Sequence, residues 1–178
     1  MAIYFLRHGE SEANAKGLFA GQRENSPLTQ HGLEQAREAA EELQLITIDI
    51  IITSELKRAL RTAEEVAVAI GFDAKKIETD KRLLEYDMGA LTGTPLRKLT
   101  SNELVSAEGA EDPYDFQARV LSFLREHKDT KENILIVSHA GVGRIIETAR
   151  LELDSSSFYD VPPYPNAEPV RLDLSWLN

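Results

Sequence analysis

The chain has 178 residues, of which 42% are hydrophobic and 28% are charged, a composition typical of globular domains. Its net charge of −10 disfavours nucleic acid and anionic membranes as partners, because both select positive surfaces. It contains no cysteine, which excludes disulfides, thiolate catalysis and cysteine metal sites.

We expect a single domain over residues 1–178, because a chain of this length buries a substantial core. The longest apolar runs are far shorter than the ~20 residues that span a bilayer. No basic or cleavable apolar segment precedes the first predicted strand, so we expect a cytoplasmic protein.

The first predicted strand covers Ala2 to Leu6, which are apolar and partly aromatic. It stops at Arg7 and His8, and Gly9 then permits a sharp turn and the close approach of a ligand. Asn14 follows in a short helix. A neutral imidazole supplies a nucleophilic nitrogen and a guanidinium supplies a fixed charge with several donors, so this strand end suits an anion.

A loop, a helix and a second strand follow. Glycine, asparagine and proline indicate a loop from Gly17 to Pro27, and Thr29 is a suitable N-cap for an amphipathic helix over residues 30–44. The isoleucine-rich run from Asp49 to Thr53 predicts a second strand, buried on both faces.

The next predicted helix is capped by Ser54 and runs to about Ile70, where Gly71 terminates it. Three cations, Lys57, Arg58 and Arg61, lie in its first two turns, where the helix dipole disfavours them. A bound anion would reduce that conflict, so one of the three is a candidate anion ligand, and the others are expected to be surface charges.

The middle of the chain has weaker patterns. Ile77 to Thr79 predicts a short strand, and residues 82–93 predict an irregular loop. Pro95 is expected to begin a short helix that reaches Leu104. The polar stretch from Ser101 to Asp112 is expected to be mobile.

The last third of the chain returns to regular elements. Asp112 predicts the N-cap of a helix that ends at His127, and residues 134–138 form the strongest predicted strand. His139 follows that strand directly. A helix over residues 142–150, a loop over 155–169 and a final strand over 170–174 complete the prediction.

Strands that alternate with amphipathic helices predict an α/β fold, a three-layer α/β/α sandwich around a mostly parallel sheet. Ligands of such sheets bind outside the carboxyl ends of the strands. His8 and His139 each follow a predicted strand, and Arg58 begins the helix after another strand. We therefore expect these three side chains to share one crevice.

The residues of this crevice resemble the motifs of a known family. Arg7-His8-Gly9-Glu10-Ser11, followed by Asn14, resembles the signature of the histidine phosphatase superfamily, the phosphoglycerate mutase-like enzymes. Three later segments resemble further motifs of that family in the same order: residues 54–59 with Thr62 and Ala63, Leu84-Glu85 with Gly89 and Gly93, and Ser138-His139-Ala140-Gly141.

The resemblance implies that His8 is a nucleophile that forms a phosphohistidine intermediate. Arg7, Arg58 and His139 would surround the phosphoryl group and neutralise its charge. No cofactor and no metal ion are implied.

The resemblance also implies a proton donor and further contacts. Glu85 would protonate the leaving oxygen, which requires its carboxyl group to stay protonated near neutral pH, an effect that partial burial favours. Asn14, Gln22 and Gly141 would contact the phosphate or the rest of a small phosphorylated substrate.

Two features favour a phosphatase over a mutase. Met88 and Leu96 stand where mutases of the family carry a tyrosine and a lysine that grip phosphoglycerate. The segment between Glu85 and His139 is also short, which leaves little room for a lid with further basic residues over region 86–112. The leaving group and the oligomeric state cannot be predicted from the sequence.

Three alternatives stay open at this point. The first is a phosphoglycerate mutase or sugar-bisphosphatase of the same superfamily. The second is a metal hydrolase that uses His8, Glu85 and His139, although Arg7 and Arg58 would repel a divalent cation. The third is a non-catalytic phosphate-binding protein, which would need neither a nucleophile nor a proton donor.

Overall fold

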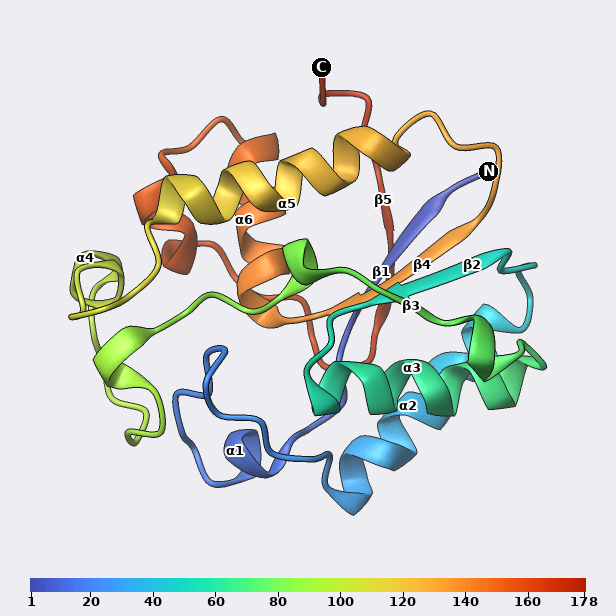
Figure 1. Cartoon of the computed structure of the whole chain (residues 1–178), viewed down its shortest axis with the longest axis horizontal. Helices are drawn as coiled ribbons and strands as arrows, with labels where there is room; N and C mark the ends of the chain where they lie inside the picture. Colours follow the sequence, from blue (N-terminus) through green and yellow to red (C-terminus); the bar gives the residue numbers. More distant parts are fainter.

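A computed structural model describes all residues 1–178 and places a five-stranded sheet between two layers of helices (Figure 1). The strand order is β3-β2-β4-β1-β5. β5 runs antiparallel to β1, and all other neighbours are parallel, which confirms the predicted α/β/α sandwich. The strands are β1 (Ile3–Arg7), β2 (Ile50–Thr53), β3 (Glu78–Thr79), β4 (Ile134–Ser138) and β5 (Pro169–Leu172).

Helices cover both faces of the sheet (Figure 1). One layer is made by α2 (Gln30–Leu43) and α3 (Lys57–Ile70), and the other by α5 (Pro113–His127) and α6 (Ala140–Arg150). The short helices α1 (Glu12–Ala15) and α4 (Ser101–Val105) lie beyond one end of the sheet. None of these helices combines the length and the apolar composition that crossing a membrane requires.

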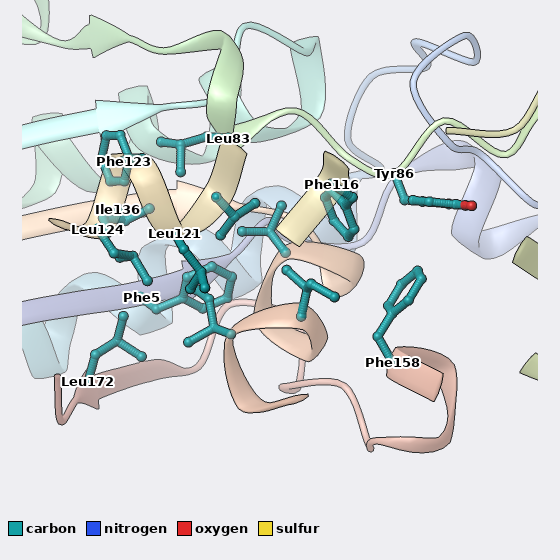
Figure 2. Close-up of a cluster of buried hydrophobic side chains, with 14 of the residues drawn as sticks. Phe5, Leu83, Tyr86, Phe116, Leu121, Phe123, Leu124, Ile136, Phe158 and Leu172 are labelled. Carbon is teal, nitrogen blue, oxygen red and sulfur yellow. The ribbon is translucent and has the colours of Figure 1, made fainter. Parts of the chain in front are cut away.

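The two helix layers pack differently. Alanines of α2 and α3 lie against Leu6, Ile51 and Val137, so small side chains bring these helices close to the sheet. The opposite layer is aromatic, and Figure 2 shows Phe116, Tyr86 and Phe158 on the same side of the sheet as Phe5. Tyr86 is fully buried in this cluster. The residue before it, Glu85, is therefore anchored to the core through its neighbour.

The expected helix from Pro95 to Leu104 is wrong in its first half. Pro95 forms an isolated β-bridge with Leu18, and the Leu96 N–H donates to the Gly17 carbonyl over 2.7 Å, so this stretch is extended. The helix begins only at Ser101, where Thr100 and Glu103 form a capping box. The stretch expected to be mobile begins with the regular helix α4, which buries Leu104.

Three smaller boundaries also differ from the prediction. Leu56, not Ser54, is the N-cap of α3, while the Ser54 hydroxyl accepts the Leu56 N–H over 3.4 Å and lies 2.8 Å from Nε2 of His139. α6 begins at Ala140, directly after the strand. The expected loop over 155–169 contains a 3-10 helix, η4 (Ser155–Asp160).

Two glycines let the end of β1 pass close to the start of α2. A Cβ on Gly9 would lie 2.3 Å from the Gly32 carbonyl oxygen, and a Cβ on Gly32 would lie 2.1 Å from the Glu10 carbonyl oxygen. The close approach at Gly9 is therefore to the backbone of α2. It holds the residue after His8 against the helix.

We predict that Gly32→Ala lowers the free energy of unfolding by about 1–3 kcal/mol, because the added methyl collides with backbone atoms. Alanine normally stabilises a helix interior relative to glycine by about 1 kcal/mol, so the expected sign is reversed. Urea denaturation measures the change, with exposed His31→Ala in the same turn as control. A stabilised Gly32→Ala variant would contradict the close approach.

Candidate active site

His8 follows β1 directly and is buried. The hydrogen bonds of its ring define a single tautomer. Its Nδ1 lies 2.7 Å from the Gly9 carbonyl oxygen, to which only an N–H can donate. The Nε–H of Arg58 donates to Nε2 of His8 over 3.2 Å, which requires a lone pair on Nε2. Both contacts place the proton on Nδ1, so Nε2 is the nitrogen that carries the lone pair.

Burial and nearby guanidinium groups also keep this ring neutral. Burial lowers the pKa of His8 well below its ordinary value, and the charges of Arg58 and Arg7 lower it further. Burial likewise lowers the pKa of His139, together with the charges of Arg58 and other groups. Both imidazoles are therefore unprotonated bases at neutral pH.

Arg58 joins the nucleophile to the loop after α1. It is only 1% exposed, and its Nη1 and Nη2 donate to the carbonyls of Glu24 and Gly21 over 2.9 and 2.8 Å. Burial lowers the pKa of Arg58, whereas the carboxylates of Glu85 and Glu24 oppose that effect. The guanidinium is thus held in place by main-chain oxygens before any anion binds.

Arg7 and His8 are held from the C-terminal part of the chain. Nη1 of Arg7 donates to the Tyr164 carbonyl over 3.1 Å, and Nδ2 of Asn166 donates to the His8 carbonyl over 2.6 Å. Nε of Arg7 is buried without a hydrogen-bond partner. The sequence analysis treated this segment only as a loop, because bonds to main-chain carbonyls leave no residue pattern.

His139 lies beside His8 because β1 and β4 are neighbours, with Arg7 opposite Ser138. The two ring centroids are 5.2 Å apart, with planes inclined at 64°. Nε2 of His139 lies 2.8 Å from the Ser54 hydroxyl, and its Nδ1 is buried with no protein partner. The ring therefore has one nitrogen left for a ligand or a water.

Glu85 reaches the site from an irregular segment. Its carboxylate accepts the N–H of Tyr86 over 2.8 Å and the N–H of Gly141 over 3.2 Å. A Cβ on Gly141 would lie only 2.1 Å from Oε1 of Glu85. Gly141 therefore admits the carboxylate to the start of α6, where the helix N-terminus favours negative charge.

One cavity of about 400 Å³ joins most of the predicted site residues. Its lining includes Arg7, His8, Asn14, Arg58, Glu85 and Gly141. His139 is not among the lining residues, although its ring centroid lies 5.2 Å from that of His8, which lines the cavity. Gln22 is also outside it, and its amide instead lies 3.5 Å from Oε2 of Glu111.

The sequence analysis missed Arg144, a further cation in the cavity. It lies on α6 three residues after Gly141, on the same side of the helix, and this spacing is the signal that could have revealed it. Nη1 of Arg144 donates to the Tyr159 carbonyl over 2.9 Å, while its Nε is buried without a partner. Burial lowers its pKa, and the carboxylate of Glu85 opposes that effect.

The rest of the cavity is mainly apolar. These side chains come from the loop after α1, the stretch around α4 and the segment near η4: Leu18, Phe19, Met88, Leu96, Leu99, Leu104, Tyr159 and Pro163. A cationic floor with an apolar wall suits an ester of phosphate whose leaving group is less polar than the phosphoryl group. The structure contains no cluster of three or more His, Cys, Asp or Glu side chains that could hold a metal ion.

A sequence model of the histidine phosphatase superfamily (branch 1) matches residues 3–175. The protein named probable phosphoglycerate mutase GpmB, from Salmonella choleraesuis (strain SC-B67), is 42% identical over 103 residues, which cover 58% of this chain and 46% of that protein. The match therefore spans about half the length of this curated relative.

Three solved structures share the fold. YhfR of Bacillus stearothermophilus is 24% identical, with a TM-score of 0.86 over 99% of this chain and 93% of that chain. Alpha-ribazole phosphatase of Shigella flexneri is 26% identical, with a TM-score of 0.80 over 97% and 90%. Mycobacterial glucosyl-3-phosphoglycerate phosphatase is 23% identical, with a TM-score of 0.80 over 96% and 92%.

The two buried imidazoles predict a loss of stability in acid. Their pKa values are lower in the folded state, so below pH ~6.5 the unfolded chain binds more protons than the folded chain. The free energy of unfolding should fall there by up to about 1.4 kcal/mol per pH unit for each ring.

We expect His139→Gln to have a shallower decline between pH 6 and 5 than the unchanged protein. Urea denaturation at several pH values measures this slope, and His31→Gln on the exposed start of α2 is the control. An unchanged slope in His139→Gln would contradict the burial of a neutral ring.

Proposed function

The chain belongs to the histidine phosphatase superfamily (branch 1), and we propose that it hydrolyses a small phosphomonoester through a phosphohistidine intermediate on His8. One observation carries the proposal. The buried ring of His8 keeps its proton on Nδ1, and Nε2 reaches a cavity that also contains Arg7, Arg58 and Glu85.

In the first step, the phosphoryl group binds between Arg7 and Arg58, which neutralise its equatorial oxygens. Nε2 of His8 attacks phosphorus as the bond to the leaving oxygen breaks, and Glu85 donates a proton to that oxygen. The Nε–H of Arg58, which faces Nε2 in the free protein, would turn to a phosphoryl oxygen. The expectation that Glu85 is protonated when substrate binds stays a prediction.

In the second step, the carboxylate of Glu85 takes a proton from water, and the water oxygen attacks phosphorus. The P–N bond breaks, its electrons return to Nε2 of His8, and inorganic phosphate leaves. If Nε2 of His139 accepts the Ser54 hydroxyl, the unpartnered Nδ1 carries the proton of the neutral ring and would donate it to a phosphoryl oxygen. The amide of Asn14 would contact the same group, since its Nδ2 has no acceptor in the protein and the residue lines the cavity.

The cavity supports a phosphatase over a mutase. A mutase must hold a polar product and return the phosphoryl group to it, whereas Met88 and Leu96 give this cavity an apolar wall. Arg144 is the one cation of the lining beyond Arg7 and Arg58. Since one relative is named a mutase and two structural relatives are named phosphatases, a mutase or bisphosphatase is the second candidate.

A metal hydrolase has less support. The guanidinium charges of Arg7 and Arg58, beside His8, oppose a divalent cation. A non-catalytic phosphate receptor would leave unexplained why Gly141 admits a carboxylate next to an anion site.

We predict that His8→Ala lowers the rate of hydrolysis of p-nitrophenyl phosphate by at least ~1000-fold, because the attacking atom is lost. Phosphate release measures the rate, and His31→Ala is the matched control. A His8→Ala protein with normal turnover of any phosphomonoester would refute the assignment of the nucleophile.

We expect Glu85→Gln to slow hydrolysis more for esters with a poor leaving group than for esters with a good one. Alkyl phosphates need a proton on the leaving oxygen, so we expect their hydrolysis to fall by about 100-fold or more. Because Glu85 also activates the water of the second step, only kcat/KM, which covers the first step alone, isolates the effect of the leaving group. p-Nitrophenolate leaves without a proton, so the kcat/KM of its ester should fall by less than about tenfold. Equal losses in kcat/KM on both esters would contradict the role of proton donor.

The two leading candidates are separated by their products. A phosphatase releases inorganic phosphate from 3-phosphoglycerate or other esters into water, whereas a mutase converts 3-phosphoglycerate to its isomer without net release. We expect phosphate release that EDTA does not diminish. Isomer exchange that exceeds phosphate release would favour the mutase.

A further inference from the structure

Arg119, on α5, uses all five of its N–H donors. Nη1 donates to the carbonyls of Arg82 and Leu84 over 2.7 and 2.9 Å, and Nη2 donates to the carbonyl of Glu85 over 3.1 Å. Nε and Nη2 donate to the two carboxylate oxygens of Glu111 over 2.7 and 3.0 Å. A guanidinium has no more donors than these, so Arg119 has none left for a substrate.

The position of Arg119 also shows that it does not contact a ligand in the cavity. Its guanidinium stacks over the Phe116 ring at 4.6 Å, and its side chain is only 20% exposed. It does not line the cavity. Arg119 therefore acts on the site only through the groups that it binds.

Those groups are the main chain that carries Glu85. This residue lies between η2 (Lys81–Leu83) and η3 (Gly89–Leu91), in a stretch without helix or strand pairing. Carbonyls in such a stretch need partners from elsewhere in the protein. One planar guanidinium supplies them for three carbonyls within four residues, and thereby defines the path of the backbone up to Glu85.

Glu111, the partner of Arg119, holds the chain on the other side of Glu85. We call this pair, Arg119 and Glu111, the clamp. Oε2 of Glu111 accepts the N–H of Asp87 over 3.2 Å, in addition to Nη2 of Arg119. The same oxygen lies 3.5 Å from Nε2 of Gln22, in the loop whose carbonyls hold Arg58. The Arg119–Glu111 pair thus holds the segment of Glu85 on both sides and connects it to the loop after α1 that holds Arg58.

We infer that Arg119, with Glu111 as its partner, is a positioning residue that holds the carboxyl group of Glu85 at the leaving oxygen. The inference rests on the proposed function of Glu85 as proton donor. Lysine cannot replace this arginine, because an ammonium has three donors and no planar fork. Gln22 then serves the clamp and has no substrate contact of its own.

The test compares two leaving groups in Arg119→Lys and Arg119→Gln. We expect the kcat/KM for an alkyl phosphate, which covers the step in which the leaving oxygen is protonated, to fall by about 10- to 100-fold, and the kcat/KM for p-nitrophenyl phosphate to stay within about threefold. In a Glu85→Gln background, Arg119→Gln should cause no further loss on the alkyl phosphate. Arg125→Gln is the matched control, since Arg125 lies on the same helix and donates only to the Asn178 carbonyl.

Equal losses on the two esters, or an additive loss in the Glu85→Gln background, would overturn the inference. Glu111→Gln covers the case in which the arginine variants do not fold. It keeps the shape of the partner but removes its charge, and the same dependence on the leaving group is expected at smaller size.

Hydrogen exchange separates this inference from the proposed function. In Arg119→Gln we expect faster amide exchange confined to residues 84–87, whether or not the unchanged protein hydrolyses any ester. An inactive unchanged protein with this exchange pattern would refute the proposed function alone. Unchanged exchange in that segment would refute the clamp.

Discussion

The hydrogen bond between Nδ1 of His8 and the Gly9 carbonyl is the contact on which the site depends. It uses the one proton of a neutral ring and leaves Nε2 with its lone pair. Burial and the charge of Arg58 disfavour a second proton, because they lower the pKa of this imidazole. The end of β1 thereby keeps this side chain as a neutral ring with a lone pair on Nε2, the state that the proposed nucleophile requires.

Arginines bound to main-chain carbonyls stabilise the irregular segments around that ring. Arg58 holds the loop after α1, Arg119 holds the segment of Glu85, and Arg7 binds the stretch before β5. The chain carries a net charge of −10, yet three guanidinium groups line this one cavity. Arg7 and Arg58 thus both hold irregular segments and line the cavity, against the overall charge of the protein.

The sequence predicted the parts of this arrangement that follow from periodicity and from strand ends. β1, β2, β4 and the convergence of His8, Arg58 and His139 at one edge follow from the burial patterns. The partners of these residues could not be predicted, because Ser54, Asn166 and the Tyr164 carbonyl reach the site through tertiary packing alone. The helix expected from Pro95 failed for the same reason, since a bridge to Leu18 outweighs local propensity.

The protonation state of His8 is the central claim, and nitrogen-15 NMR of the histidine rings tests it most directly. At pH 7 we expect a neutral His8 with the proton on Nδ1 and an unprotonated Nε2, and we expect that signal to be lost in His8→Ala. A proton on Nε2, or a charged imidazolium at this pH, would contradict the account of the nucleophile.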